Sequence, residues 1–141
     1  MESAKRNMAL MPGLGGTCVA IFNFILFFLY PRFVSGEANR IFFRLAVGDI
    51  IVSLFFFMYA ATFYYLFVEA FARDANRAIG YFTWADRCAV AAIAFFTISP
   101  ALVLFAIDLP DLGFVALGLW VVYLGILVIL VITDRARKAR G

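Results

Sequence analysis

The side chain most able to do chemistry in this sequence is an aspartate inside a long apolar stretch. Residues 45–68 carry a single charge, Asp49, and are bracketed by Arg44 and Glu69. A helix of about 20 apolar residues is long enough to cross a hydrocarbon core of about 30 Å. Asp49 would then lie about 7 Å inside the boundary near Arg44. An acid at this depth indicates either a proton or cation site or a polar contact between helices.

Four other polar side chains are predicted to lie near this acid. Ser53 follows Asp49 by one helical turn, and Asn23, Ser99 and Trp120 reach a similar depth from other apolar stretches. An amide, a hydroxyl and an indole N–H could all donate to the Asp49 carboxylate and satisfy it while it is ionised. We favour a packing role for this intramembrane cluster over a role as an ion site.

The helix that carries Asp49 also shows a stripe on which a second helix can pack. Its members recur at heptad-like spacing and are mostly small or polar: Ala46, Asp49, Ser53, Phe56 and Ala60. Small residues let two helix backbones approach closely in a membrane. The stripe therefore favours a contact between this helix and another span.

The composition argues against an enzyme. The chain has no histidine, which removes the commonest ligand for metals and haem. Its two cysteines, Cys18 and Cys88, are too few for a cysteine-only metal site and too far apart for a CxxC motif. P-loop, GxSxG and HExxH motifs are all missing. We expect no catalytic residues, no metal and no resident cofactor.

The apolar stretches predict the fold. The chain has 141 residues, of which 66% are hydrophobic and 15% charged, so there is room for one membrane domain. We expect an all-α polytopic membrane protein, a single antiparallel bundle of four transmembrane helices. The predicted spans are residues 14–30, 45–68, 88–107 and 112–133.

Proline and glycine residues mark the expected ends of these spans. Pro12 and Gly13 should break the chain before the first span, and Pro31 should end it. A loop is expected around residues 74–80, and a very short turn at 108–111 makes the last two spans antiparallel neighbours. Pro100 should kink the third span.

The positive charges predict the orientation. Nine of the 12 lysine and arginine residues lie on the side of the two termini, and three, Arg32, Arg40 and Arg44, lie on the other. The positive-inside rule then places both termini in the cytoplasm, and we expect a bacterial inner membrane. The net charge of +3 fits contact with anionic lipids and does not indicate nucleic-acid binding.

Several charged residues are expected at the membrane surface. Arg40, Arg44 and Arg87 are predicted to bind lipid phosphates. Asp86 is expected to meet Arg73 or Arg77 at the cytoplasmic surface. The alternative is a buried pair of Asp86 with Arg87, which would need residues 81–85 to enter the bilayer.

The 18 phenylalanines surround their helices instead of forming one stripe. Such a surface suits lipid tails, quinones or carotenoids, or a partner subunit.

Two functional hypotheses remain. The first is a non-catalytic accessory subunit that stabilises or regulates a membrane assembly, as a homo-oligomer or in a larger complex. The alternative is a small oligomeric channel, or a proton- or cation-coupled transporter, that uses Asp49.

Overall fold

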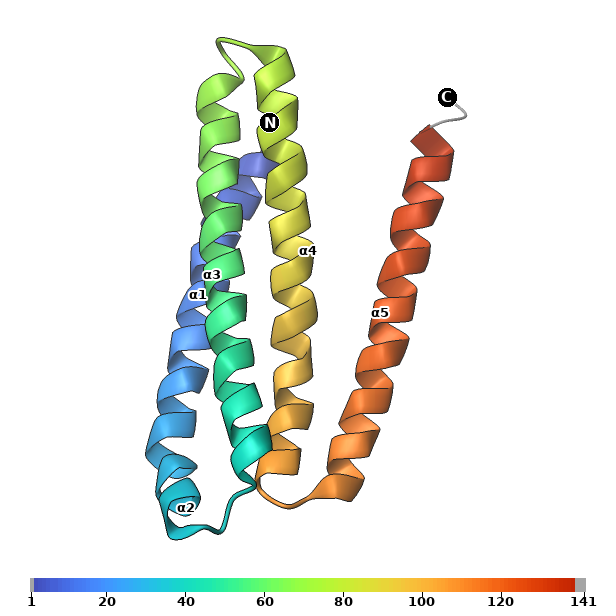
Figure 1. Cartoon of the computed structure of the whole chain (residues 1–141). Helices are drawn as coiled ribbons and strands as arrows, with labels where there is room; N and C mark the ends of the chain where they lie inside the picture. Colours follow the sequence, from blue (N-terminus) through green and yellow to red (C-terminus); the bar gives the residue numbers. More distant parts are fainter. Residues whose placement is uncertain (1, 139–141) are drawn as a thin grey trace.

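The computed structural model describes the backbone of residues 2–138 and the side chains of residues 6–129 and of Thr133. All regular structure in this part of the chain is helical. The elements are α1 (Glu2–Phe28), α2 (Tyr30–Ser35), α3 (Arg40–Ala70), α4 (Ala75–Ala106) and α5 (Pro110–Lys138). Figure 1 shows the long helices running up and down in turn.

Four helical segments within the described residues are long and apolar enough to cross a membrane. They are Arg6–Ser35, Arg40–Ala70, Ala75–Ala106 and Pro110–Ile129. The predicted all-α fold with four transmembrane helices is therefore confirmed, and the chain is an integral membrane protein. The start of α1, the α3–α4 connection and the last turns of α5 lie toward one end, called the terminal end below (Figure 1).

The first helix begins earlier than predicted. α1 starts at Glu2 and continues through Pro12, so the expected break at Pro12 and Gly13 is wrong. A proline inside a helix removes one backbone hydrogen bond. Met11 is buried, and Met8 and Leu14 pack against the core on either side of it, so packing holds the helix together across that gap.

The first span also ends later than predicted, because Pro31 does not stop the helical segment. α1 ends at Phe28, and Pro31 lies in the first turn of the short helix α2, where a missing N–H costs little. α2 ends at Ser35 and is capped by Gly36, whose φ of 81° is in the left-handed region that glycine tolerates. The apolar segment thus extends to Ser35.

Side-chain caps fix the starts of the two central helices. The Asn39 side chain accepts hydrogen bonds from the backbone N–H groups of Ile41 and Phe42 at the start of α3. The Asp74 side chain does the same for Asn76 and Arg77 at the start of α4. The loop predicted around residues 74–80 is therefore wrong beyond Asp74, because this cap starts the helix at Ala75.

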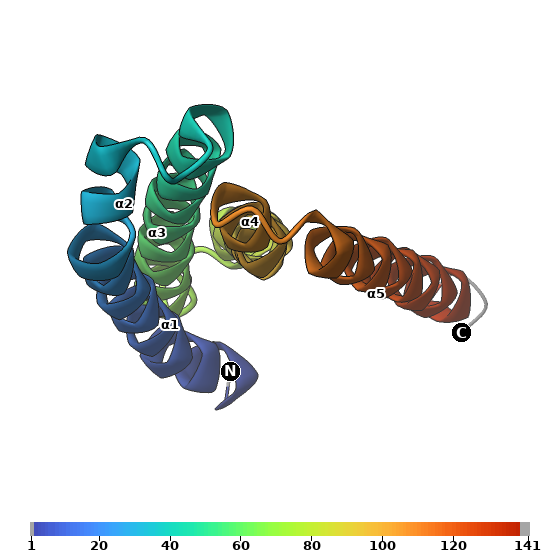
Figure 2. The same cartoon turned by 90° about the horizontal axis from the view of Figure 1, so that it is seen from below.

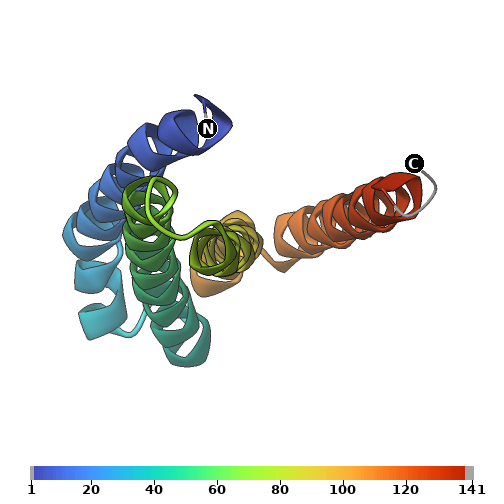
Figure 3. The same cartoon turned by 90° about the horizontal axis from the view of Figure 1, so that it is seen from above.

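α3 is the central helix of the packing. It lies between α1 and α4, and Figures 2 and 3 show α1, α3, α4 and α5 side by side in a curved row. We call α1 to α4 the three-helix body, after its three long helices. Its buried core comprises Met11, Cys18, Ile25, Leu29, Phe43, Ile50, Phe57, Ala60, Tyr64, Phe67, Ala78, Ala85, Ala89, Ala92 and Ala106.

α5 is attached at the end opposite the terminal end. The turn before it contains Asp108, whose φ is 63°. At the start of α5, a Cβ atom on Gly113 would come within 2.9 Å of the Phe105 ring, so the two helices are in close contact there. Away from this turn α5 diverges from α4 (Figure 1). Only 6% of the α5 span is buried, compared with 28% of the α3 and α4 spans.

Candidate functional site

The Asp49 carboxyl group lies at the contact between α3 and α4. The Ser99 hydroxyl of α4 donates a hydrogen bond of 2.5 Å to Asp49 Oδ2. Ser99 is 3% exposed, so this bond is shielded from the surroundings. Two members of the predicted cluster, from positions 50 residues apart, are thus joined directly.

Ser53 lies beside Asp49 but does not bind its carboxyl group. The Ser53 hydroxyl is fully buried and donates to the backbone carbonyl oxygen of Asp49 at 2.9 Å. Serine in a helix commonly forms this bond to the residue one turn earlier. Ser53 therefore satisfies its own hydroxyl within α3 and leaves the carboxyl group to Ser99.

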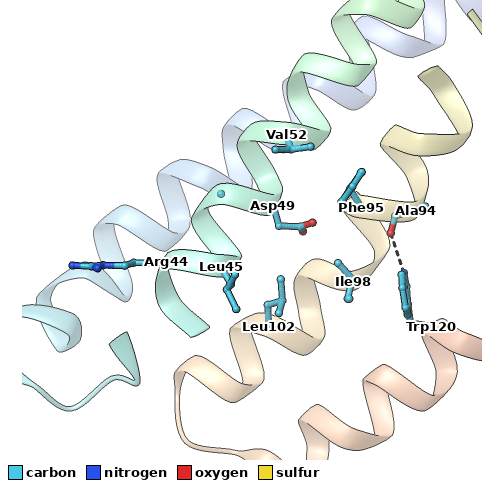
Figure 4. Close-up of a pocket in the computed structure, with 10 residues that line it drawn as sticks. Arg44, Leu45, Asp49, Val52, Ala94, Phe95, Ile98, Leu102 and Trp120 are labelled. Atoms are coloured by element: carbon cyan, nitrogen blue, oxygen red, sulfur yellow. Dashed lines mark hydrogen bonds between the residues drawn. The ribbon is translucent and has the colours of Figure 1, made fainter. Parts of the chain in front are cut away.

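Asp49 opens onto a groove between α3, α4 and α5. The groove has a volume of about 510 Å³. Figure 4 shows its ten lining residues, with the Asp49 carboxyl group pointing from α3 toward α4. They are Arg44, Leu45, Gly48, Asp49, Val52, Ala94, Phe95, Ile98, Leu102 and Trp120. Asp49 and Arg44 are the charged members of this lining, and the other walls are almost entirely apolar.

Trp120 reaches the groove but not the carboxyl group. Its indole N–H donates to the carbonyl oxygen of Ala94 at 2.9 Å, which ties α5 to α4 (Figure 4). The predicted bond from Trp120 to Asp49 is not formed. The tryptophan instead contributes an aromatic wall on the α5 side of the groove.

Asn23 does not join the cluster. α1 packs on α3 through a buried stripe of Cys18, Ile25 and Leu29. Asn23 precedes Ile25 by two residues, which is about 200° around a helix, so it lies on the opposite face of α1 and is exposed. In addition, α1 packs on α3 and hardly at all on α4, where the groove lies.

The α3 stripe is also shifted from the predicted one. Ala46, Ser53 and Ala60 are fully buried, as the small-residue pattern predicts. Asp49 and Phe56 are only half-buried, and Ile50 and Phe57 take the central positions. Asp49 therefore lies at the edge of the α3 contact surface, which is why it meets both Ser99 and the groove.

A second polar network, which sequence reasoning missed, lies nearer the terminal end. The Tyr64 hydroxyl donates to Asp86 Oδ1 at 2.5 Å and accepts from Asn7 Nδ2 at 3.3 Å. It joins α3, α4 and α1. Extending the heptad stripe from Ala60 by four residues would have indicated that Tyr64 is buried. The expected partners of Asp86, Arg73 or Arg77, make no ion pair with it, and Asp86 instead accepts from this tyrosine.

The three predicted lipid anchors are all exposed. Arg40, Arg44 and Arg87 carry exposed side chains. The Arg87 guanidinium lies 5.4 Å from the centre of the Trp84 ring, a cation–π contact. Phosphate binding by these arginines stays a prediction. The side chains of Lys5 and of the C-terminal basic tail lie outside the described residues.

The remaining candidate ligands are scattered. Cys18 is buried and Cys88 half-buried, and both are free thiols. No three histidine, cysteine, aspartate or glutamate side chains gather within the described part of the chain.

Comparison with known proteins gives no relative. No family model, no curated protein sequence and no solved structure matches this chain. Its function must therefore be inferred from its own geometry.

Proposed function

We propose that the chain is a non-catalytic integral membrane protein, a small accessory subunit that stabilises or regulates a membrane assembly by packing against other transmembrane helices. The observation that carries this proposal is the isolation of α5. Among the described residues this helix packs mainly on α4, and 6% of the Pro110–Ile129 span is buried. An apolar helix with so little internal contact offers most of its surface to its surroundings.

The glycines of α5 favour protein over lipid as the neighbour. Gly118 and Gly125 are exposed, and a side chain added at either would meet no atom within 4 Å. They are seven residues apart and so share one helix face. Glycine on a membrane helix face allows a second helix backbone to approach closely. A homo-oligomer and a larger complex are both compatible with such a face.

Native mass spectrometry from mild detergent tests this function. We expect a defined stoichiometry above one, with a second copy or a partner subunit. The variant G118L/G125L adds bulk to the proposed contact face and should dissociate the complex. Gly80→Leu is the matched control, because Gly80 is also an exposed helical glycine with open space around it. A wild-type monomer without partners would remove the main support.

We also propose an orientation with both termini in the cytoplasm of a bacterial cell, based on the distribution of positive charges. In a C18A/C88A background, Glu37→Cys should react with a membrane-impermeant maleimide in intact cells, and Ala72→Cys should not. Both positions are exposed, in the connections at opposite ends of α3. The reverse labelling pattern would invert the orientation.

The groove supports a second candidate function, a small oligomeric channel or a proton- or cation-coupled transporter that uses Asp49. The supporting observation is that this carboxyl group lines an open groove at membrane depth. Asp49→Asn keeps the shape and removes the charge, so it should abolish proton or cation flux in proteoliposomes. Unchanged flux in this variant, measured against protein-free liposomes, would eliminate the transport hypothesis.

A further inference from the structure

We infer that the groove between α3, α4 and α5 binds a lipophilic monovalent cation, meaning a molecule with one substituted ammonium-type or phosphonium-type charge on an apolar body. This inference names a ligand class for the Asp49 groove. It shares the Asp49 carboxylate with the second candidate function, transport. It does not require transport, because a ligand can bind in the groove without crossing the membrane.

The dimensions and walls of the groove suit a small organic molecule. Its volume of about 510 Å³ falls within the usual range for small-molecule sites, about 300–1,000 Å³. Leu45, Val52, Ile98 and Leu102 form apolar walls on α3 and α4. Such walls favour an apolar body over a hydrated ion, because an ion that leaves water needs many polar ligands to replace its hydration shell.

The Asp49 carboxyl group is the ionisable group that points into the groove. Asp49 Oδ2 accepts the hydrogen bond from Ser99, and Oδ1 has no hydrogen-bond partner among the described residues. The carboxyl group points into the space between α3 and α4, whereas the Arg44 side chain points away from it at the edge of the groove (Figure 4). A single cation would therefore meet the carboxylate oxygen that remains available.

Two aromatic rings add to this preference. Phe95 of α4 and Trp120 of α5 both line the groove (Figure 4). The Trp120 ring is held in place by its hydrogen bond to Ala94. The faces of aromatic rings attract cations, more strongly when the cation is desolvated, and substituted ammonium ligands are commonly recognised in this way. One carboxylate with two aromatic rings is thus more complementary to an organic cation than to an anion.

Tetraphenylphosphonium is a suitable probe, and tetraphenylborate is its size-matched anion. Binding is measured by isothermal titration calorimetry on the full chain in lipid nanodiscs, with protein-free nanodiscs as the reference for membrane partitioning. We expect saturable binding of tetraphenylphosphonium and none of tetraphenylborate. Asp49→Asn should weaken cation binding by about tenfold or more, because it removes one partner of a partly desolvated charge pair. Asp111→Asn, an exposed acid on α5, is the matched control and should bind as the wild type does.

A second variant, Val52→Trp, and the fluorescence of Trp120 test whether the cation binds in the groove. Val52→Trp adds a bulky ring to the groove wall, keeps Asp49 in the chain, and should also abolish binding. In a Trp84→Phe background, Trp120 is the remaining tryptophan, and its fluorescence should change on titration with the cation.

Three results would overturn the inference: equal binding by wild type and Asp49→Asn, stronger protein-dependent binding of tetraphenylborate, or binding that survives Val52→Trp. The binding experiment and the flux experiment test different claims, so one can fail while the other succeeds. Saturable binding without flux contradicts only the transport hypothesis, and Asp49-dependent proton flux without binding contradicts only this inference.

Discussion

The Tyr64 hydroxyl links α1, α3 and α4 through two hydrogen bonds, and the ring that carries it is 1% exposed. A phenylalanine here would keep the packing but leave Asp86 and Asn7 without their partner. We expect Tyr64→Phe to lower the free energy of unfolding by about 1 kcal/mol, the usual scale for a hydrogen bond inside a membrane protein. Unfolding in mixed micelles measures this change.

Tyr65→Phe is the control for this prediction, because Tyr65 is exposed and follows Tyr64 directly. It should leave stability unchanged. If the two variants were equally stable, the network at Tyr64 would have no energetic role.

Ser99 should matter in a similar way at the other polar contact. Ser99→Ala removes the donor to Asp49 and leaves a carboxyl group at membrane depth with less compensation. We expect a loss of about 1 kcal/mol in unfolding free energy. Ser35→Ala removes an exposed hydroxyl bonded to its own helix and should cost less. Equal losses in thermal unfolding would argue against a stabilising Asp49–Ser99 bond.

For single residues, the sequence predicted how deep each side chain lies in the membrane, but not the direction in which it points. Counting residues inward from the span ends indicated that Asp49 and Ser99 could meet. It also grouped Asn23 and Trp120 with them, because depth alone says nothing about rotation around a helix axis. Asn23 is at a suitable depth, but it lies on the exposed face of α1. The Trp120 N–H donates to the backbone carbonyl oxygen of Ala94 and not to the Asp49 carboxyl group.

Among the elements, the start of α5 is the most constrained. A Cβ on Gly113 would overlap the Phe105 ring, so with a larger side chain either this ring or the α5 backbone must shift. Gly113→Leu should reduce stability by about 1–3 kcal/mol through overpacking. It should also lengthen the distance between spin labels on the two helices. Gly118→Leu, which meets no neighbour, should not change this distance within one protomer.

The observed helix bounds differ from the predicted ones where packing or a side-chain cap outweighs the local sequence signal. Pro12 reads as a helix breaker, but one missing hydrogen bond is outweighed by the packing of Met11 and its neighbours on the core. The Asp74 cap extends α4 back to Ala75, although residues 75–80 look like a loop by composition. Span existence was predictable from apolar length, whereas span ends depended on capping and on tertiary contacts.

The molecule as a whole divides into a packed three-helix body and an attached helix. The buried core described above contains no residue of α5. We therefore expect a fragment of residues 1–109 to fold alone in detergent, with a cooperative transition by circular dichroism. A fragment of residues 36–141 lacks α1 and part of that core, and it should unfold at lower denaturant. Failure of the first fragment to fold would show that α5 is needed for the body.

The sequence could not predict this division. All four spans carry large apolar side chains on most of their faces, because lipid and protein neighbours both accept apolar side chains. The pattern therefore identifies four spans without saying which faces pair. The alanines of α4 and the Ala46, Ser53 and Ala60 stripe of α3 supply one strong pairing signal. Residues 110–129 of α5 show no comparable stripe facing α4.

The attachment of α5 through one short turn also bears on biosynthesis. Ribosomes make the N-terminal part of a chain first, and completed parts fold while the rest is still being made. The core of α1, α3 and α4 can thus close before Pro110 enters the membrane. α5 then enters the membrane beside a folded surface, and its choice of neighbour follows the closure of the three-helix body. Changes on the exposed face of α5, such as those at Gly118 and Gly125, can accordingly alter that choice without disturbing what was folded before it.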